Sequence, residues 1–268
     1  MPIPLIIVSQ GRSGTTLMVR LLAAHPEIVA HTAYPCELQL LTFAFFRNHP
    51  VGGNPKRLEF FRFDGDEELV YRPLARGEPY TATSIRAAYQ RIGKNLGKAP
   101  RYFVEKSFPD IDLEPIVTTF PDLRFIDLRR DPRDVLMSAR AFDARRSCRG
   151  FRERDGDSDE TVVLEYRRVF EVMARNLTKA PYHVIRYEDL ILKPKPALAS
   201  LLDWLGLASS TSIVSLMLET IRGYEIAHHR TASSEVASIG RWRREMSPSL
   251  QALYAVHLGD FLKYHGYD

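Results

Sequence analysis

Residues 3–16 read IPLIIVSQGRSGTT, in which a mostly apolar run is followed by a loop of glycine, hydroxyl and other polar residues. The run at residues 3–8 is typical of a buried strand, and Leu17, Leu21 and Leu22 follow the loop at helical spacing. The loop therefore joins a strand to the start of a helix. Because the first amide groups of a helix lack partners and lie at the positive end of its dipole, this position favours an anion.

The loop matches the phosphate-binding pattern G-x-x-x-x-G-K-[ST] only in part. Gly14 and Thr16 fit the pattern, whereas Ser9 replaces the first glycine and Thr15 replaces the lysine. Gly11 and Gly14 permit a tight turn and the close approach of a ligand. Such a loop can also be an ordinary turn, but its place after the first strand favours phosphate binding. Without the lysine that contacts β- and γ-phosphates, the loop argues against a nucleoside triphosphatase.

Length and composition favour one α/β domain over residues 1–268 rather than two small ones, because 268 residues with 45% hydrophobic content can bury a sizeable core. The chain has no apolar stretch of the about 18 residues that a membrane helix needs and no basic leader. We therefore expect no membrane span, no signal peptide and a cytoplasmic location.

Cys36 and Cys148 cannot build a disulfide framework and do not show metal-ligand spacing. For Cys36, a buried thiol is favoured over a nucleophile.

The net charge of +4 and the pI of about 9.0 suit an anionic small ligand as well as nucleic acid. The segment 140–154 is rich in arginine and is followed by an acidic run at 155–160. It lacks the aromatic interleaving of a surface that binds single strands, so we expect no nucleic-acid partner. We interpret the segment as a solvated loop, with a lid over an anionic ligand as the alternative.

Strand-like and helical segments alternate along the chain. This pattern predicts a P-loop-like, three-layer α/β fold, with a central parallel sheet flanked by helices. The expected strands are Ile3–Val8, Tyr102–Glu105, Leu123–Leu128 and Tyr182–Ile185. The expected helices span residues 15–24, 36–47, 80–95, 110–119, 132–145, 159–178, 195–205, 211–221 and 248–264. The segment 223–240 is interpreted as a loop long enough to suspect function.

Cations follow three of the four expected strands, as Lys106, the pair Arg129 and Arg130, and Arg186. Ligands of open parallel sheets gather at the carboxyl ends of the strands, so the ligand is expected to carry several negative charges. Asp131 caps the next expected helix, which leaves Arg130 at the ligand edge.

Ser138 lies about two turns into that helix, where its hydroxyl could meet a phosphate that Arg130 also holds. Taken alone, Arg130 could be a surface or carboxylate-paired arginine, and Ser138 an ordinary serine of a helix interior. The phosphate loop favours the ligand site.

Four motifs, in the family's order, resemble the sulfotransferase superfamily that uses 3′-phosphoadenosine 5′-phosphosulfate (PAPS). RSGTT at 12–16 is similar to the 5′-phosphosulfate loop, RDPRDVLMS at 130–138 to the 3′-phosphate segment, YEDL at 187–190 to the segment near the adenine, and GRW at 240–242 to the loop that closes over the nucleotide. The resemblance covers most of the chain. It implies donor binding by Arg12, Ser13, Gly14, Thr15, Thr16, Arg130, Ser138 and Tyr187.

Two departures from the family pattern shift the expected donor contacts. The Arg-Lys-Gly that often precedes the C-terminal Gly-x-Trp is replaced by residues 235–237 (EVA), so we expect Ser238 or Arg241 to contact the 3′-phosphate. Leu17 replaces the tryptophan that stacks on adenine in cytosolic relatives. Adenine stacking then depends on Tyr187, for which the alternative is a role in the core.

The resemblance also directs the search for a general base. Cytosolic relatives use a histidine in a Lys-Thr-His-Leu-Pro-like run, whereas this chain reads EKSFP at 105–109. A branch that includes tyrosylprotein and some bacterial carbohydrate sulfotransferases uses a glutamate after the first helix, where Glu37 falls. We expect Glu37 to be the base, the alternative being that it only opens a helix. His31 is the runner-up and, like Lys106, is expected near the substrate.

Arg12 stands where many cytosolic relatives have lysine, and it is expected to stabilise charge on the bridging oxygen. The resemblance thus implies sulfuryl transfer from PAPS to a hydroxyl of a small-molecule or carbohydrate acceptor, which releases adenosine 3′,5′-bisphosphate (PAP) and needs no metal. The alternatives are a P-loop small-molecule kinase, a nucleotide-binding module without catalysis, and a peptide tyrosine as acceptor. The sequence leaves the acceptor and the oligomeric state open.

Overall fold

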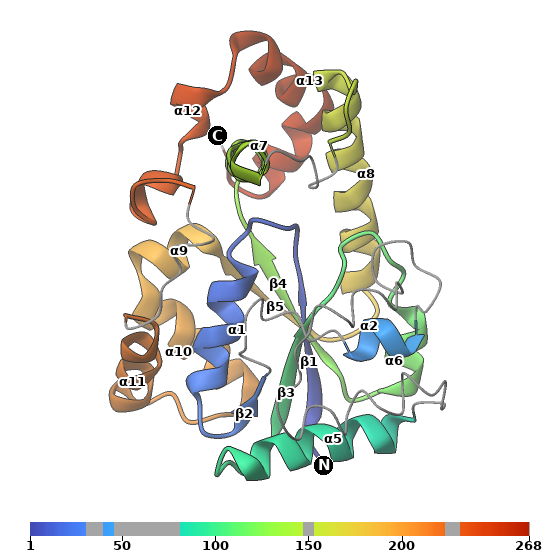
Figure 1. Cartoon of the computed structure of the whole chain (residues 1–268), viewed down its shortest axis with the longest axis vertical. Helices are drawn as coiled ribbons and strands as arrows, with labels where there is room; N and C mark the ends of the chain where they lie inside the picture. Colours follow the sequence, from blue (N-terminus) through green and yellow to red (C-terminus); the bar gives the residue numbers. More distant parts are fainter. Residues whose placement is uncertain (31–39, 46–80, 147–152, 223–230, 268) are drawn as a thin grey trace.

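The computed structural model describes residues 1–30, 40–45, 81–146, 153–222 and 231–267 (Figure 1). Their strands form one five-stranded sheet in the order β2-β3-β1-β4-β5. Each neighbouring pair is parallel. The strands are β1 (Ile3–Val8), β2 (Ile28–Val29), β3 (Tyr102–Lys106), β4 (Arg124–Arg129) and β5 (Tyr182–Arg186). The predicted α/β fold with a central parallel sheet is confirmed.

Helices cover both faces of the sheet, and a third group lies beyond the carboxyl ends of the strands (Figure 1). The first face carries α1 (Thr15–Ala24), α10 (Pro194–Leu205) and α11 (Thr211–Arg222). The second carries α2 (Leu40–Phe45), α5 (Ala82–Asn95), α6 (Glu114–Thr119) and part of α8 (Asp159–Leu177). Above the strand ends lie α7 (Pro132–Arg146), α12 (Trp242–Glu245) and α13 (Pro248–Tyr264). The short helix α9 (Tyr187–Leu192) follows β5 directly.

The apolar run that begins the chain serves both faces of the sheet. Because successive side chains of a strand point to opposite sides, Leu5 and Ile7 join the core under α1, whereas Ile6 and Val8 join the core under α5 and α6. Each of these four side chains is almost fully buried. The run lacks polar alternation because β1 is the central strand and has no exposed face.

A separate apolar cluster holds the upper helices together. Leu136 of α7, Tyr166 of α8 and Tyr254 of α13 are buried in it. The Tyr254 hydroxyl also donates to the carbonyl oxygen of Pro132, at 3.2 Å. This cluster fixes α7, whose first residues directly follow β4, over the carboxyl end of the sheet.

Most of the predicted elements are present, and the differences have local causes. The expected helix 110–119 begins only at Glu114, because Asn176 of α8 accepts the Leu113 amide at 3.0 Å and donates to the Ile111 carbonyl at 2.7 Å. Strand β4 starts and ends one residue later than expected. The strand β2 and the helices α9 and α12 were not predicted. Among the described residues, no helix is both long enough and apolar enough to cross a membrane.

Candidate active site

The loop between β1 and α1 has the backbone of an anion-binding turn. Arg12 and Gly14 both adopt the left-handed conformation, with φ of 72° and 90°. The Ser13 amide donates to the carbonyl of Gln10 at 3.3 Å, which closes the turn. Gly14 is the N-cap residue of α1, so the helix receives no side-chain cap from it. The first amide groups of α1 therefore lie at the carboxyl end of β1 without a side-chain cap, an arrangement suited to an anion.

Gly14 is required at its position for two reasons. Its φ of 90° strains any other residue, and a Cβ added there would lie 2.6 Å from Cδ2 of Tyr187. The Tyr187 ring is buried against Gly14, with the guanidinium carbon of Arg130 4.4 Å from its centroid. The tyrosine thus contacts both the loop and Arg130.

Replacing Gly14 with Ala is expected to destabilise the fold by about 1–3 kcal/mol. Gly97 is the matched control, because it has a similar φ of 68° but nothing within 4 Å of an added Cβ. Urea unfolding of G14A and G97A separates backbone strain from the clash with Tyr187. Equal losses in the two variants would show that the contact with Tyr187 does not matter.

Arg12 and Arg130 connect the loop to α7 and to the C-terminal part of the chain. The Arg12 Nε donates to Oγ of Ser138 at 3.3 Å, and its guanidinium carbon lies 4.4 Å from the centre of the Phe142 ring. Arg130 donates through Nη1 to the carbonyl of Arg12 and through Nη2 to the carbonyl of Ser238, both at 2.7 Å. One buried guanidinium therefore ties the phosphate loop to the segment before Gly240.

Thr231 joins this group although the sequence did not single it out. Its hydroxyl lies 3.0 Å from that of Ser138 and accepts from Nη1 of Arg241 at 3.0 Å. The hydroxyls of Tyr187 and Ser238 are likewise 3.0 Å apart. The structure thus brings six predicted donor-site residues into one cluster, which we call the cation cluster: Arg12, Arg130, Ser138, Tyr187, Ser238 and Arg241.

The cation cluster brings three guanidinium groups together in a buried place, where Arg241 also pairs with Glu245 at 2.7 Å. Burial, together with the neighbouring guanidinium groups of Arg130 and Arg241, lowers the pKa of Arg12 to about 10. The Nε of Arg130 is buried and has no hydrogen-bond partner among the described residues. Three crowded guanidinium groups and an unused donor fit a multiply charged anion, which would relieve their repulsion and accept their hydrogen bonds.

Lys106 supplies a cation on another side of the loop. It ends β3, is largely buried, and its Nζ lies 3.3 Å from Oγ1 of Thr16 in the first turn of α1. The predicted neighbourhood of Lys106 and the phosphate loop is therefore present. Positive side chains thus approach the loop from the end of β3 and from Arg130, in the connection between β4 and α7.

A protein-family model for the sulfotransferase family matches residues 4–211. The chain belongs to the sulfotransferase family. This confirms the resemblance seen in the sequence. Comparison with curated proteins gave no match.

Solved sulfotransferase structures share the fold at low sequence identity. The sulfotransferase domain from the curacin biosynthetic pathway matches with a TM-score of 0.57 and 21% identity, covering 95% of this chain and 97% of that one. The domain from the Synechococcus PCC 7002 olefin synthase gives 0.58 and 21%, covering 96% and 94%. A sulfotransferase from Alicyclobacillus acidocaldarius gives 0.50 and 17%, covering 91% and 99%.

Within this sulfotransferase fold, Glu105 is adjacent to Lys106 in β3, but its side chain lies on the opposite face of the sheet. Its buried carboxyl group accepts from the Tyr89 hydroxyl at 2.5 Å and from the Leu41 amide at 3.0 Å. Glu105 therefore holds the first turn of α2 against the end of β3. Burial raises the pKa of Glu105 to about 8, although these hydrogen bonds act in the opposite direction.

This pKa predicts a pH-dependent stability. Because the folded protein keeps the Glu105 proton up to about pH 8 while the unfolded chain releases it near 4.5, the stability contributed by this group is present below pH 4.5 and is lost as the pH rises to about 8. Urea unfolding of the wild type and of Glu105→Gln measures the effect as a difference. The wild type should lose stability relative to E105Q over that range, and a constant difference would contradict the assignment.

Several predicted residues lie outside the described part of the chain. These include Glu37, His31, Cys36 and Cys148, so the assignments of the base and the thiols stay predictions. In the arginine-rich segment 140–154, Arg140 pairs with Glu153 at 2.9 Å and with Asp159 at 2.6 Å. This arginine is neutralised by Glu153 within the segment and by Asp159 of the acidic run that follows it. Whether the segment acts as a lid stays a prediction.

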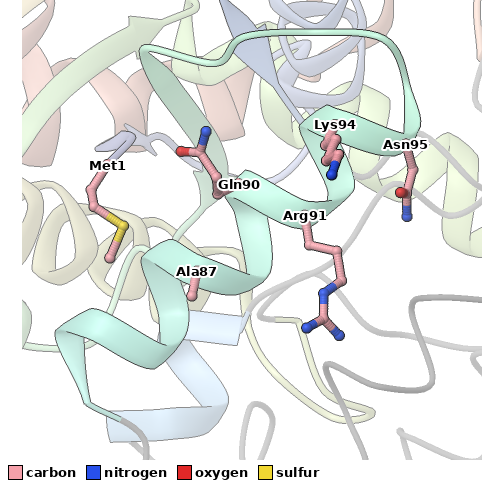
Figure 2. Close-up of a pocket in the computed structure, with 6 residues that line it drawn as sticks. All are labelled: Met1, Ala87, Gln90, Arg91, Lys94 and Asn95. Carbon is pink, nitrogen blue, oxygen red and sulfur yellow. The ribbon is translucent and has the colours of Figure 1, made fainter.

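A surface hollow lies away from this site. Figure 2 shows it beside α5 and the first residue, at the end of the sheet opposite to the phosphate loop in Figure 1. It is wide open and shares no residue with the cation cluster. Its lining residues are Met1, Ala87, Gln90, Arg91, Lys94 and Asn95.

Proposed function

We propose that this chain is a PAPS-dependent sulfotransferase that moves a sulfuryl group to a hydroxyl of a small-molecule or carbohydrate acceptor, with residues 1–268 acting as one domain. The observation that carries the proposal is the cation cluster beside the phosphate loop. PAPS has a phosphate at the 3′ position and a phosphosulfate at the 5′ position, so its recognition needs two separate groups of anion-binding residues. The loop amides supply one group, and Arg130, Ser138 and Arg241 supply the other.

The phosphate loop is assigned to the 5′-phosphosulfate. Amides at the start of α1, including those of Thr15 and Thr16, would donate to its oxygens, and Gly14 allows their close approach. Lys106 adds charge beside Thr16. The hydrogen-bond donors of the loop suit sulfate as well as phosphate, because both groups present anionic oxygens in a tetrahedral arrangement.

The Arg130–Ser138–Arg241 side of the cation cluster is assigned to the 3′-phosphate. The free Nε of Arg130 is a buried donor, and the Ser138 hydroxyl lies between Arg12 and Thr231. We place Tyr187 near the adenine on the strength of the YEDL motif, with its ring in contact with Gly14 and 4.4 Å from the guanidinium carbon of Arg130. The bases of nucleotides stack readily on aromatic rings.

In the transfer step, the acceptor oxygen forms a bond to sulfur while the bond from sulfur to the bridging oxygen of the 5′-phosphate breaks. Glu37 takes the proton of the acceptor hydroxyl, and the electron pair of the broken bond stays on PAP. Arg12 and Lys106 stabilise the negative charge that develops there. Because the guanidinium of Arg12 holds its proton, it acts as an electrostatic stabiliser and not as an acid. No metal is required for these roles.

Calorimetry tests the donor assignment directly. PAP should bind, and it should bind more tightly than adenosine 5′-phosphate (AMP), which lacks the 3′-phosphate. Incubation with labelled PAPS and cell extract should then transfer label to a metabolite, identified by its gain in mass. Binding of ATP with Mg²⁺ in place of PAP would favour a kinase, and PAP binding without transfer would favour a module that only binds nucleotide.

A further inference from the structure

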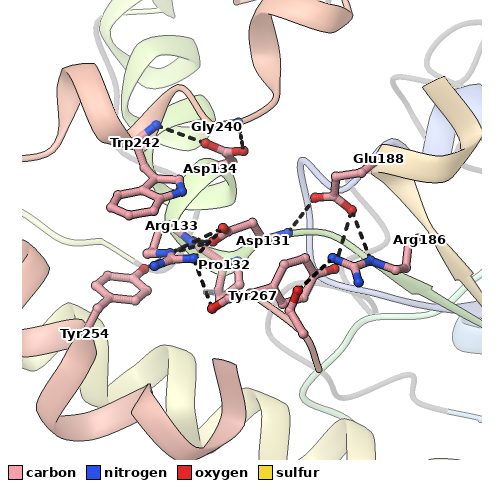
Figure 3. Close-up of polar contacts among 11 residues, drawn as sticks. Asp131, Pro132, Arg133, Asp134, Arg186, Glu188, Gly240, Trp242, Tyr254 and Tyr267 are labelled. Carbon is pink, nitrogen blue, oxygen red and sulfur yellow. Dashed lines mark hydrogen bonds and ion pairs between the residues drawn. The ribbon is translucent and has the colours of Figure 1, made fainter. Parts of the chain in front are cut away.

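Asp134 holds both ends of the short segment that carries Arg241. This aspartate lies in the first turn of α7 and is 1% exposed. Its Oδ2 accepts from the Gly240 amide at 2.6 Å and its Oδ1 accepts from the Trp242 amide at 3.0 Å (Figure 3). One carboxylate therefore binds the backbone immediately before and immediately after Arg241.

The same helix carries Ser138 one turn further along. Arg241 reaches Thr231, and Thr231 contacts Ser138, each at 3.0 Å. Because residues four apart share one face of a helix, Asp134 and Ser138 both face the segment 231–242. The Asp134 carboxylate binds the backbone on both sides of Arg241. The Ser138 hydroxyl and the Arg241 side chain both contact Thr231.

Neighbouring contacts reinforce this arrangement. The Arg133 guanidinium carbon lies 3.8 Å from the centre of the Trp242 ring, and Arg133 is fixed by an ion pair with Asp131 at 2.8 Å (Figure 3). Gly240 has a φ of 67°, a conformation that strains other residues. A Cβ at Gly240 would also lie 3.0 Å from Nη1 of Arg243. The turn thus has little freedom to move relative to α7.

Asp134 itself is not placed to act on a substrate. Both of its oxygens accept backbone amides, and its side chain is buried. Burial raises the pKa of Asp134, whereas the two amide donors and the nearby Arg130 lower it. Burying a charge is costly unless it is hydrogen-bonded, and among the described residues the hydrogen bonds of Asp134 go to the turn around Arg241.

We propose that Asp134 is a positioning residue for Arg241, and that it thereby determines how strongly the site prefers a nucleotide with a 3′-phosphate. The proposal rests on the proposed function, in which Arg241 faces that phosphate. It assigns to Asp134 an effect on one phosphate of the ligand and not on nucleotide binding in general.

The test compares the affinities for PAP and AMP by calorimetry. Asp134→Asn places an amide donor against one of the two backbone N–H groups, so the turn loses a charge-assisted hydrogen bond. The ratio of the AMP to the PAP dissociation constant should fall about tenfold or more. Arg241→Gln should lower the same ratio. In the double variant the ratio should fall no further than in R241Q, because Asp134 acts through Arg241.

Asp127→Asn is the matched control, because Asp127 is also a buried carboxylate at this edge of the sheet but pairs with Arg129, at 2.5 Å. The ratio of the AMP to the PAP dissociation constant in D127N should equal that of the wild type. The inference is overturned if D134N lowers the two affinities equally, leaves the ratio unchanged, or adds to R241Q. Wild-type protein that does not prefer PAP over AMP would instead contradict the proposed function.

Gly240→Ala gives a second test that keeps the carboxylate and is needed if D134N does not fold. The substitution strains the same turn through its φ of 67° and through the contact with Arg243. Its ratio of AMP to PAP dissociation constants should also fall. A folded G240A protein with the wild-type ratio would overturn the inference, since the position of the turn would then not affect recognition.

Discussion

Replacing Glu37 with Gln is expected to lower the rate of sulfuryl transfer by at least about 100-fold, because a general base contributes that much or more to such a step. Glutamine has nearly the same shape but cannot accept the proton of the acceptor hydroxyl. The affinity for PAP should stay unchanged, since the donor contacts come from the phosphate loop and the cation cluster. The measurements are single-turnover transfer of labelled sulfate and calorimetry with PAP.

The controls for this prediction address the base and the general effect of removing a carboxylate. Glu219 is an exposed glutamate on α11, and Glu219→Gln should transfer sulfate at the wild-type rate. His31→Asn tests the runner-up base. Transfer at the wild-type rate by E37Q would contradict the assignment of Glu37, and loss of transfer in H31N with the rate kept in E37Q would identify His31 as the base.

The central elements of the fold follow from local patterns. The run at 3–8 and the spacing of Leu17, Leu21 and Leu22 predicted β1 and α1 with their observed bounds. The strand β2 was missed because its two residues, Ile28 and Val29, become a strand only by pairing with Tyr102 and Phe103 of β3. Local sequence does not contain a pairing between such distant residues.

Helix boundaries were missed where a distant side chain or a proline competes with the helical pattern. Asn176 holds the backbone of residues 111–113 outside the helix, across more than sixty positions of the sequence. Pro194 begins α10, while Lys193 before it has φ of −136°, so α9 and α10 are separate helices. The first of these causes depends on tertiary packing and is therefore invisible in a local pattern.

The identity of the cluster residues was easier to predict than their orientation. The motifs and their order along the chain predicted Arg130, Ser138 and Arg241, and the structure places these residues together. Arg12 was predicted at the sulfuryl end, yet its Nε contacts Ser138 and its pKa reflects Arg130 and Arg241. In this structure the Arg12 side chain contacts Ser138, on the side that we assign to the 3′-phosphate, so its predicted role requires it to exchange this contact for the bridging oxygen.

Thr231 and Glu105 show what motif reasoning leaves out. Thr231 lies in the long segment 223–240, which was suspected of function only because of its length. Glu105 was noted as a neighbour of Lys106, but its partners Tyr89 and Leu41 come from two other elements. Both residues act through contacts between segments that the sequence does not place side by side.

Replacing Arg130 with Ala is expected to weaken PAP binding by about 100-fold or more. The substitution removes a buried cation and the free Nε donor assigned to the 3′-phosphate, and losses of about 2–5 kcal/mol are common when one partner of a buried charge pair is removed. It also deletes the bonds to the carbonyls of Arg12 and Ser238, so the loop and the C-terminal segment lose their connection. AMP binding should fall less than PAP binding, because AMP lacks the 3′-phosphate.

The neighbouring arginine on β4 provides a matched control for Arg130. Arg129 has the same side chain but points to Asp127 and His265, at 2.5 Å and 2.7 Å, and not to the cluster. Arg129→Ala should bind PAP within about threefold of the wild type. Together with the large loss in R130A, this would show that the position of the charge matters and not the number of arginines.

Arg130→Lys then separates charge from geometry, because lysine keeps the charge but cannot bond both carbonyls and a phosphate through one planar group. An R130A protein that binds PAP as tightly as the wild type would contradict the assignment of Arg130, and with it the view that one guanidinium joins the loop, the adenine side and the C-terminal segment around the donor.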